Sequence, residues 1–120
     1  MGSTMQALTG HLNDYQTAAA RTINDTSYSP EQLAIFTLGL CGESGEVAEL
    51  VKKHLGHGRA LDRDRMIEEI GDVLWYVAAL ATLLQVPLAE LADRNIEKLK
   101  VRHPNGFKFA QSQAPKDATP

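Results

Sequence analysis

Four acidic residues stand in two pairs that could bind a divalent cation. Glu43 and Glu46 are three positions apart, and Glu69 and Asp72 repeat this spacing further along the chain. On an α-helix, residues three apart project from one face, separated by about 60° around the axis. Two such pairs on consecutive helices can face each other. Because like charges repel, the pattern predicts a cation where they meet.

Carboxylate oxygens are hard ligands, which suit Mg²⁺ and also Mn²⁺. Di-iron helical bundles use a Glu followed three residues later by a His, and no Glu in this chain has that partner. His54 and His57 have the spacing of a zinc-ligand pair, but they flank Gly56 in an expected turn, so we expect exposed side chains instead. The alternative to a metal site is an ordinary solvated acidic face. Two pairs, each beside an apolar or glycine-rich helix segment where charge is costly, favour the metal.

A magnesium ion held by a few carboxylates commonly also binds substrate phosphates, so cationic side chains are expected nearby. Asn95, Lys98 and Arg102 form one stripe on an expected helix. Lys52 and Lys53 follow the first acidic pair by about two helical turns. The alternative is that these cations only stabilise helix C-termini and solubilise the surface.

Four helices are predicted to position these residues, and no strand is predicted. We expect the first, second and fourth over about 8–22, 30–54 and 87–102, and the third capped by Asp62 or Asp64 and reaching about residue 85. Ser29 is expected to cap the second helix, with Pro30 at its first position and Gln32 completing a capping box. The fold class is therefore all-α, a bundle of four helices. We expect one domain over 5–110, which at this size completes its core by oligomerising, and a disordered tail over 111–120.

Several small and aromatic residues bear on packing. Gly39, Gly42 and Gly45 lie inside the second helix, where each costs about 1 kcal/mol relative to Ala, so close approach of a helix or ligand is expected. Trp75 is expected in the core, and Cys41 is expected to be a small buried residue.

Composition excludes several classes of function. The net charge is −3 and the cations are scattered among acids, which disfavours nucleic acid and anionic membranes as partners. A single cysteine excludes an intrachain disulfide. The longest apolar stretch, 73–84, is shorter than the roughly 20 residues of a membrane-spanning helix. No secretory signal is evident, so a cytoplasmic location is expected.

Three segments together resemble the MazG-type nucleotide pyrophosphohydrolases: 39–50 with its ExxE, 69–76 with its ExxD, and 95–107 with its NxxKLxxR. The resemblance spans 15–107 and implies that Glu43, Glu46, Glu69 and Asp72 bind Mg²⁺. It also implies hydrolysis of (deoxy)nucleoside triphosphates to monophosphate and pyrophosphate, by a homodimer or a tetramer made of two dimers. One departure is Gly42, where many members have a second glutamate before Glu43; Glu49 is a weaker substitute.

The resemblance and the spacing together suggest roles for individual residues. Glu46 and Glu69 are the expected catalytic carboxylates, with Glu46 accepting the proton of the attacking water. The expected substrate contacts are Lys53, Lys98 and Arg102 at the phosphates, and Tyr76, Asn95 and Gln16 at the nucleoside. Two alternatives remain: a non-catalytic helical dimerisation module, and a related all-α enzyme acting on dUTP or nucleoside diphosphates.

Overall fold

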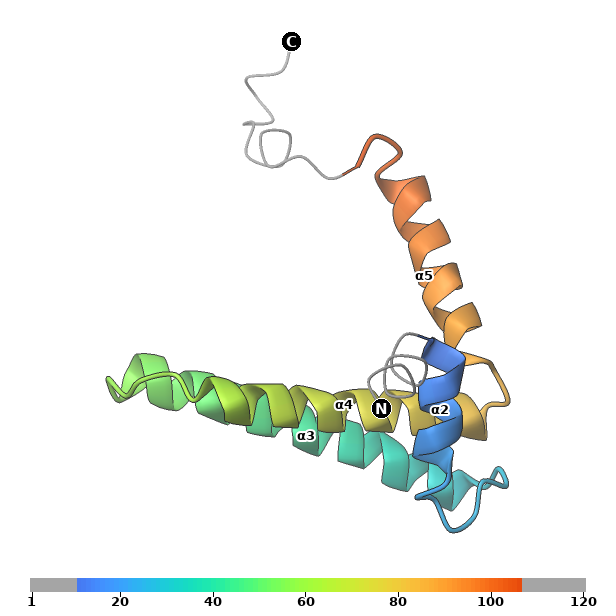
Figure 1. Cartoon of the computed structure of the whole chain (residues 1–120), viewed down its shortest axis with the longest axis horizontal. Helices are drawn as coiled ribbons and strands as arrows, with labels where there is room; N and C mark the ends of the chain where they lie inside the picture. The colour runs from blue at the N-terminus through green and yellow to red at the C-terminus, as the bar shows by residue number, and fades with distance from the viewer. Residues whose placement is uncertain (1–10, 107–120) are drawn as a thin grey trace, which may run out of the picture. The chain divides into compact units, whose positions relative to one another are not determined.

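The computed structural model describes residues 11–106, and within this range the chain is all-helical, with four helices and no strand. The helices are α2 (Leu12–Ala20), α3 (Pro30–Gly56), α4 (Arg63–Leu83) and α5 (Leu88–Arg102), as Figure 1 shows. The all-α prediction is confirmed, and the predicted helix ends that fall within the described residues differ from these by a few positions at most. The predicted start of the first helix, at residue 8, lies outside them. Some of the predictions concern positions outside the described residues. These are residues 5–10 of the expected domain, position 107 of the third motif and the expected tail 111–120.

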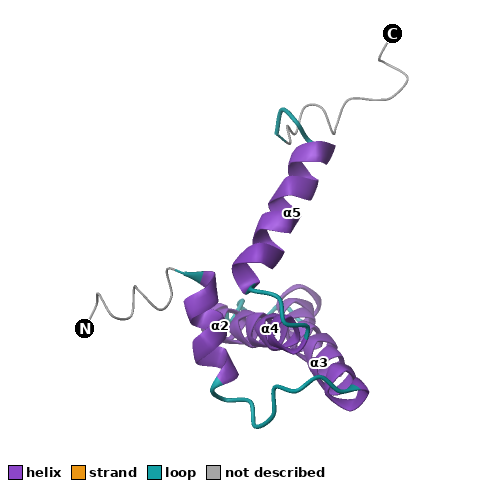
Figure 2. Cartoon of the chain, turned by 90° about the vertical axis from the view of Figure 1, so that its right-hand side faces the viewer, coloured by secondary structure: helices purple, strands orange, loops and turns teal. Residues whose placement is uncertain are grey.

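The long helices α3 and α4 run side by side as an antiparallel hairpin (Figure 1), and α2 packs against α4 (Figure 2). These contacts belong to a compact unit whose described part ends at Ala89. The described residues from Glu90 onward form a second unit, which contains most of α5. The candidate site is therefore built from the hairpin.

Side-chain caps begin both hairpin helices. The Ser29 hydroxyl accepts a hydrogen bond from the backbone N–H of Gln32 at 3.0 Å, and Pro30 stands at the start of α3, as predicted. Asp62 caps α4 by accepting from the backbone N–H of Arg65 at 3.1 Å. The capping-box prediction is wrong in one respect, because the Gln32 side chain donates to the Asp25 carbonyl at 2.8 Å. The preceding loop brings that carbonyl within reach, so Gln32 ties the loop to α3.

The core of this unit consists of two small clusters on opposite sides of α4. One contains Ala19 of α2 with Ala78 and Ala81 of α4, and the other contains Phe36 of α3 with Ala79 of α4. Alanine side chains let neighbouring helices approach α4 closely on both sides. Trp75 and Tyr76 are partly buried beside these clusters, and Trp75 packs against both.

Glycine at position 39 permits the tightest contact in the hairpin. A Cβ atom built there would overlap the Tyr76 ring, whereas a Cβ at Gly42 or Gly45 would meet no neighbouring atom within 4 Å. The predicted close approach is therefore confirmed at Gly39 only. Cys41 is exposed, so its predicted burial is wrong. It lies two positions beyond Gly39, about 200° around the helix axis, and so points away from α4.

No single helix among the described residues is both long and apolar enough to cross a membrane, although α4 and α5 counted together reach that length and composition.

Substituting the two types of glycine should have opposite effects. Gly39→Ala forces the Tyr76 ring to move, and overpacking of this kind destabilises a fold by about 1–3 kcal/mol. Gly42→Ala is the matched control, and it should stabilise the helix by up to about 1 kcal/mol because it adds no contact. Chemical denaturation of both variants without metal measures these differences. Equal effects in the two variants would contradict the Gly39–Tyr76 contact.

Candidate metal centre

Acidic side chains interrupt the apolar contact between α3 and α4. Phe36 lies edge-on to Trp75, with ring centroids 6.1 Å apart, and Gly39 lies against Tyr76 one turn later. The next turn of α3 carries Glu43, and on α4 the corresponding positions carry Glu69 and Asp72. A layer of carboxylates thus follows directly on a layer of aromatic rings.

Three carboxylates converge in this layer. Glu43, Glu69 and Asp72 each offer one oxygen, and these oxygens lie within 4.8 Å of one another. Glu43 and Glu69 are half-buried and Asp72 is exposed. This triad is the only group of three or more potential ligands that close together within residues 11–106.

Crowding of the acids affects the pKa of the Glu43 carboxyl group. Its pKa is raised, first because its carboxyl group hydrogen-bonds that of Glu69 and next because it is partly desolvated. The negative charges of Asp72, Glu69 and Glu46 raise the pKa further. A divalent cation bound among these oxygens would offset the repulsion between them.

Glu46 is the one predicted ligand outside the triad. Its side chain is exposed, and its charge contributes to the raised pKa of Glu43. The structure thus brings three of the four predicted ligands together, and the ligand role of Glu46 stays a prediction. Glu49, the weaker candidate, is paired with Lys52 at 4.0 Å instead.

Arg65 supplies a positive charge that the sequence analysis missed. Its guanidinium Nη2 lies 3.3 Å from Oε1 of Glu69. The Glu69 side chain is 13% exposed and the Arg65 side chain 50% exposed, so the pair lies at the rim of the acidic layer. The four-residue spacing on one helix was the available signal. Arg65 partly compensates the charge of the triad.

Three predicted phosphate contacts have no ion-pair partner among the described residues. Lys53 is half-buried near the end of α3. Lys98 and Arg102 are exposed along α5, in the second unit, on the same stripe as Asn95. Other α5 cations are paired within the helix, Arg94 with Glu90 at 2.7 Å and Lys100 with Glu97 at 3.4 Å. Lys98 and Arg102 are therefore available to bind anions, and their predicted role stays untested.

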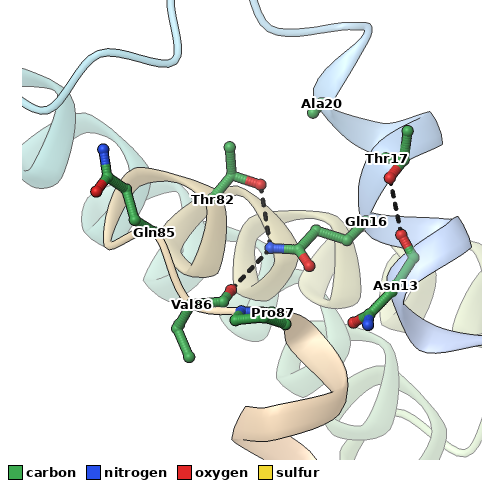
Figure 3. A pocket seen from close by; sticks show the side chains of 8 residues that line it. All are labelled: Asn13, Gln16, Thr17, Ala20, Thr82, Gln85, Val86 and Pro87. Carbon is green, nitrogen blue, oxygen red and sulfur yellow. Dashed lines mark hydrogen bonds between the residues drawn. The ribbon is translucent and has the colours of Figure 1, made fainter.

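Gln16 holds α2 against the turn between α4 and α5, as Figure 3 shows in part. Its amide nitrogen donates to the Val86 carbonyl at 3.0 Å and to the Thr82 hydroxyl at 3.3 Å. Its amide oxygen accepts from the backbone N–H of Leu88 at 2.7 Å. Both ends of the amide are engaged, which is a structural role that the sequence analysis did not foresee.

The remaining predicted residues take part in local structure. Tyr76 packs edge-on against Phe36 and Trp75, with centroid distances of 6.5 and 4.9 Å. His54 bonds through Nδ1 to the Arg59 carbonyl at 2.6 Å, which ties the end of α3 to the following turn.

Comparison with known proteins adds a family match. A model of the MazG nucleotide pyrophosphohydrolase domain matches residues 32–107. The chain is also similar to the Gene 37 protein of Mycobacterium phage L5, with 40% identity over 108 residues, covering 80% of this chain and 91% of the relative. No solved structure matches the chain. The family match includes both acidic pairs and the cationic stripe of α5.

Removing the Arg65 charge should expose the repulsion within the triad. Arg65→Gln should lower the free energy of unfolding in EDTA by a few tenths to about 1 kcal/mol, as for other partly exposed ion pairs. Mg²⁺ should then raise the melting temperature more than in the parent, because the cation no longer competes with Arg65. Arg94→Gln is the matched control, since it breaks an ion pair of the same spacing away from the triad. Identical metal responses in the parent and Arg65→Gln would contradict this role.

Proposed function

Because the chain belongs to the MazG nucleotide pyrophosphohydrolase domain family, we propose that it is a Mg²⁺-dependent hydrolase that converts (deoxy)nucleoside triphosphates to monophosphates and pyrophosphate. The observation that carries this proposal is the triad of carboxylates within 4.8 Å in the hairpin. The triad lies inside the region that matches the family.

The ligand chemistry fits magnesium. All three oxygens are carboxylate oxygens, which Mg²⁺ prefers and Mn²⁺ also accepts. Glu43, Glu69 and Asp72 would hold the ion, with Glu46 as a fourth ligand. The ion would neutralise charge on the triphosphate and lower the pKa of the attacking water.

The protein residues would position substrate and water around the ion. Glu46 makes no hydrogen bond with a described residue, so its carboxylate is free to accept the water's proton. Glu69 is held by the Arg65 guanidinium, which suits a second catalytic carboxylate that positions the water. Lys53, Lys98 and Arg102 would bind the phosphates electrostatically, and Asn95 and Tyr76 would contact the nucleoside. Gln16 would act by holding α2 against the end of α4 and the turn that follows it.

Neutralising single acids should distinguish the acids that bind the metal or accept a proton from acids outside the site. Asp72→Asn and Glu46→Gln should each lower kcat by at least about a hundredfold, because loss of a ligand or proton acceptor exceeds the usual effect of an outer-shell change. Asp72→Asn should also lose the Mg²⁺-induced rise in melting temperature. Glu49→Gln is the control, since Glu49 lies outside the triad and pairs with Lys52. Circular dichroism should show unchanged helix content, and full activity of either site variant would contradict the assignment.

Product analysis tests the reaction itself. The protein is incubated with the common nucleoside and deoxynucleoside triphosphates, with Mg²⁺ or with EDTA, and the phosphate-containing products are resolved. Monophosphate plus pyrophosphate, formed only with Mg²⁺, is the expected result. Turnover confined to dUTP or to nucleoside diphosphates would instead indicate the related all-α enzymes. Absence of any metal-dependent turnover would favour a non-catalytic helical module.

A homodimer, or a tetramer of two dimers, is part of the proposal. Ile67, Ile70 and Leu74 form one row on α4 and are 52%, 51% and 40% exposed. Such a row on the central helix of a small domain suits burial against a second copy.

A charge in this row should dissociate the oligomer. Ile67→Glu should shift the mass measured by light scattering from dimer or tetramer to monomer, because a charge is costly in an apolar interface. Leu61→Glu, at an exposed apolar residue outside the row, should leave the mass unchanged. A parent protein that is monomeric at micromolar concentration would contradict the proposal.

A further inference from the structure

A cavity of about 450 Å³ lies between the loop after α2, the first turns of α3 and Trp75 of α4. Its apolar wall includes Phe36 and Trp75, and its polar wall includes Asn24 and Gln32. Small-molecule sites commonly have this volume and this combination of apolar surface with a few polar groups.

Two residues that line the cavity lie within about two helical turns of the acidic triad along the hairpin. Trp75 is three residues beyond Asp72 on α4, a rise of about 4.5 Å, and Phe36 is seven residues before Glu43 on α3, about 10.5 Å. A second cavity, about 510 Å³, is lined by Thr82 and by the turn that follows α4. Thr82 lies about 15 Å along α4 from Asp72. A nucleotide whose phosphates lie at the triad therefore reaches the first cavity more directly than the second.

Trp75 is held rigidly at the wall of the first cavity. Its indole N–H donates to the Thr22 hydroxyl at 2.9 Å, and that hydroxyl donates to the Ala19 carbonyl at 2.7 Å. Its ring makes edge contacts with Phe36 and Tyr76, at interplanar angles of 88° and 86°. Because the indole donor is already used, Trp75 presents only ring surface to a ligand. Such a surface suits stacking against an aromatic base.

The polar wall offers a hydrogen-bonding edge on a fixed loop. Asp25 anchors the loop, since its carboxylate accepts from the backbone N–H of Ser27 at 2.9 Å and its carbonyl accepts from Gln32. The Asn24 side chain is exposed and makes no hydrogen bond with a described residue. An amide carries a donor and an acceptor side by side, the combination that pairs with the edge of a nucleobase.

We propose that this cavity is the nucleobase subsite, in which the base stacks on Trp75 and its edge is read by the Asn24 amide, with the free oxygen of Gln32 as a second acceptor. The proposal rests on the proposed function, because it takes the triad as the phosphate end of the same substrate. According to the proposal, Asn24 determines the specificity for the base. Its loop, between α2 and α3, lies outside the three motifs at 39–50, 69–76 and 95–107.

Substitution of Asn24 tests the reading of the base. Asn24→Ala should lower kcat/KM for the preferred base by about 5- to 100-fold, the usual value of a bidentate amide–base pair, and so reduce discrimination among the triphosphates. Asn24→Asp keeps the size of the side chain but loses the donor, and it should shift preference away from the same base. Neither variant should alter the Mg²⁺-induced rise in melting temperature. Gln85→Ala is the matched control, because it removes an exposed amide from the wall of the second cavity.

A binding measurement separates this subsite from the hydrolytic activity. Trp75 is the only tryptophan of the chain, so its fluorescence can be titrated with the nucleoside monophosphates of each base in Mg²⁺ buffer. Saturable quenching that Asn24→Ala weakens and Gln85→Ala does not supports the subsite, even if the parent protein hydrolyses no triphosphate. Unchanged base preference and unchanged quenching in Asn24→Ala overturn the subsite, even if the parent is a pyrophosphohydrolase. An effect of Gln85→Ala alone overturns it in favour of the second cavity.

Discussion

Mutual repulsion of carboxylates between two packed helices is the constraint on which the rest of this structure depends. Glu43, Glu69 and Asp72 meet where a helical hairpin would ordinarily bury apolar side chains, and the raised pKa of Glu43 reflects that crowding. The layer contributes little apolar burial, so the hairpin must be stabilised by the layers beside it. Because a cation would turn this repulsion into attraction, the proposed metal binding would be thermodynamically linked to the stability of the hairpin.

The neighbouring layer of aromatic rings supplies the apolar packing that the acidic layer lacks, and it borders the proposed substrate site. Gly39 lets the Tyr76 ring lie against α3, and Phe36 and Trp75 pack edge-on one turn away. Trp75 also bonds Thr22 at the end of α2, so the same indole joins the hairpin to the loop that carries Asn24. The side chains that stabilise this end of the hairpin are thus the ones that form the proposed surface for a base.

Local patterns predicted much of this arrangement. Features that depend only on residues within two helical turns are readable in the sequence. They include the helix periodicity, the Ser29 cap and the placement of each acidic pair on one helix face. Gln16 was interpreted incompletely because its partners lie 66–72 residues away, and the Gln32 contact depends on the path of a loop. The pairing of Arg65 with Glu69 is local, and its four-residue spacing is readable in the sequence. Cys41 is small enough for the core, but its angular position on α3 leaves it exposed. The acids lie beside apolar segments, yet no charged side chain among residues 11–106 is fully buried.

The central claim is that one cation is shared by acids of both hairpin helices. It is tested most directly by crystals of the full chain grown with Mn²⁺, in which the ion is located by its anomalous scattering. The account predicts a peak within coordination distance of carboxylate oxygens from both α3 and α4, at Glu43, Glu69 and Asp72. A peak bound by one helix alone, or ordered carboxylates pointing apart at saturating Mn²⁺, would contradict it.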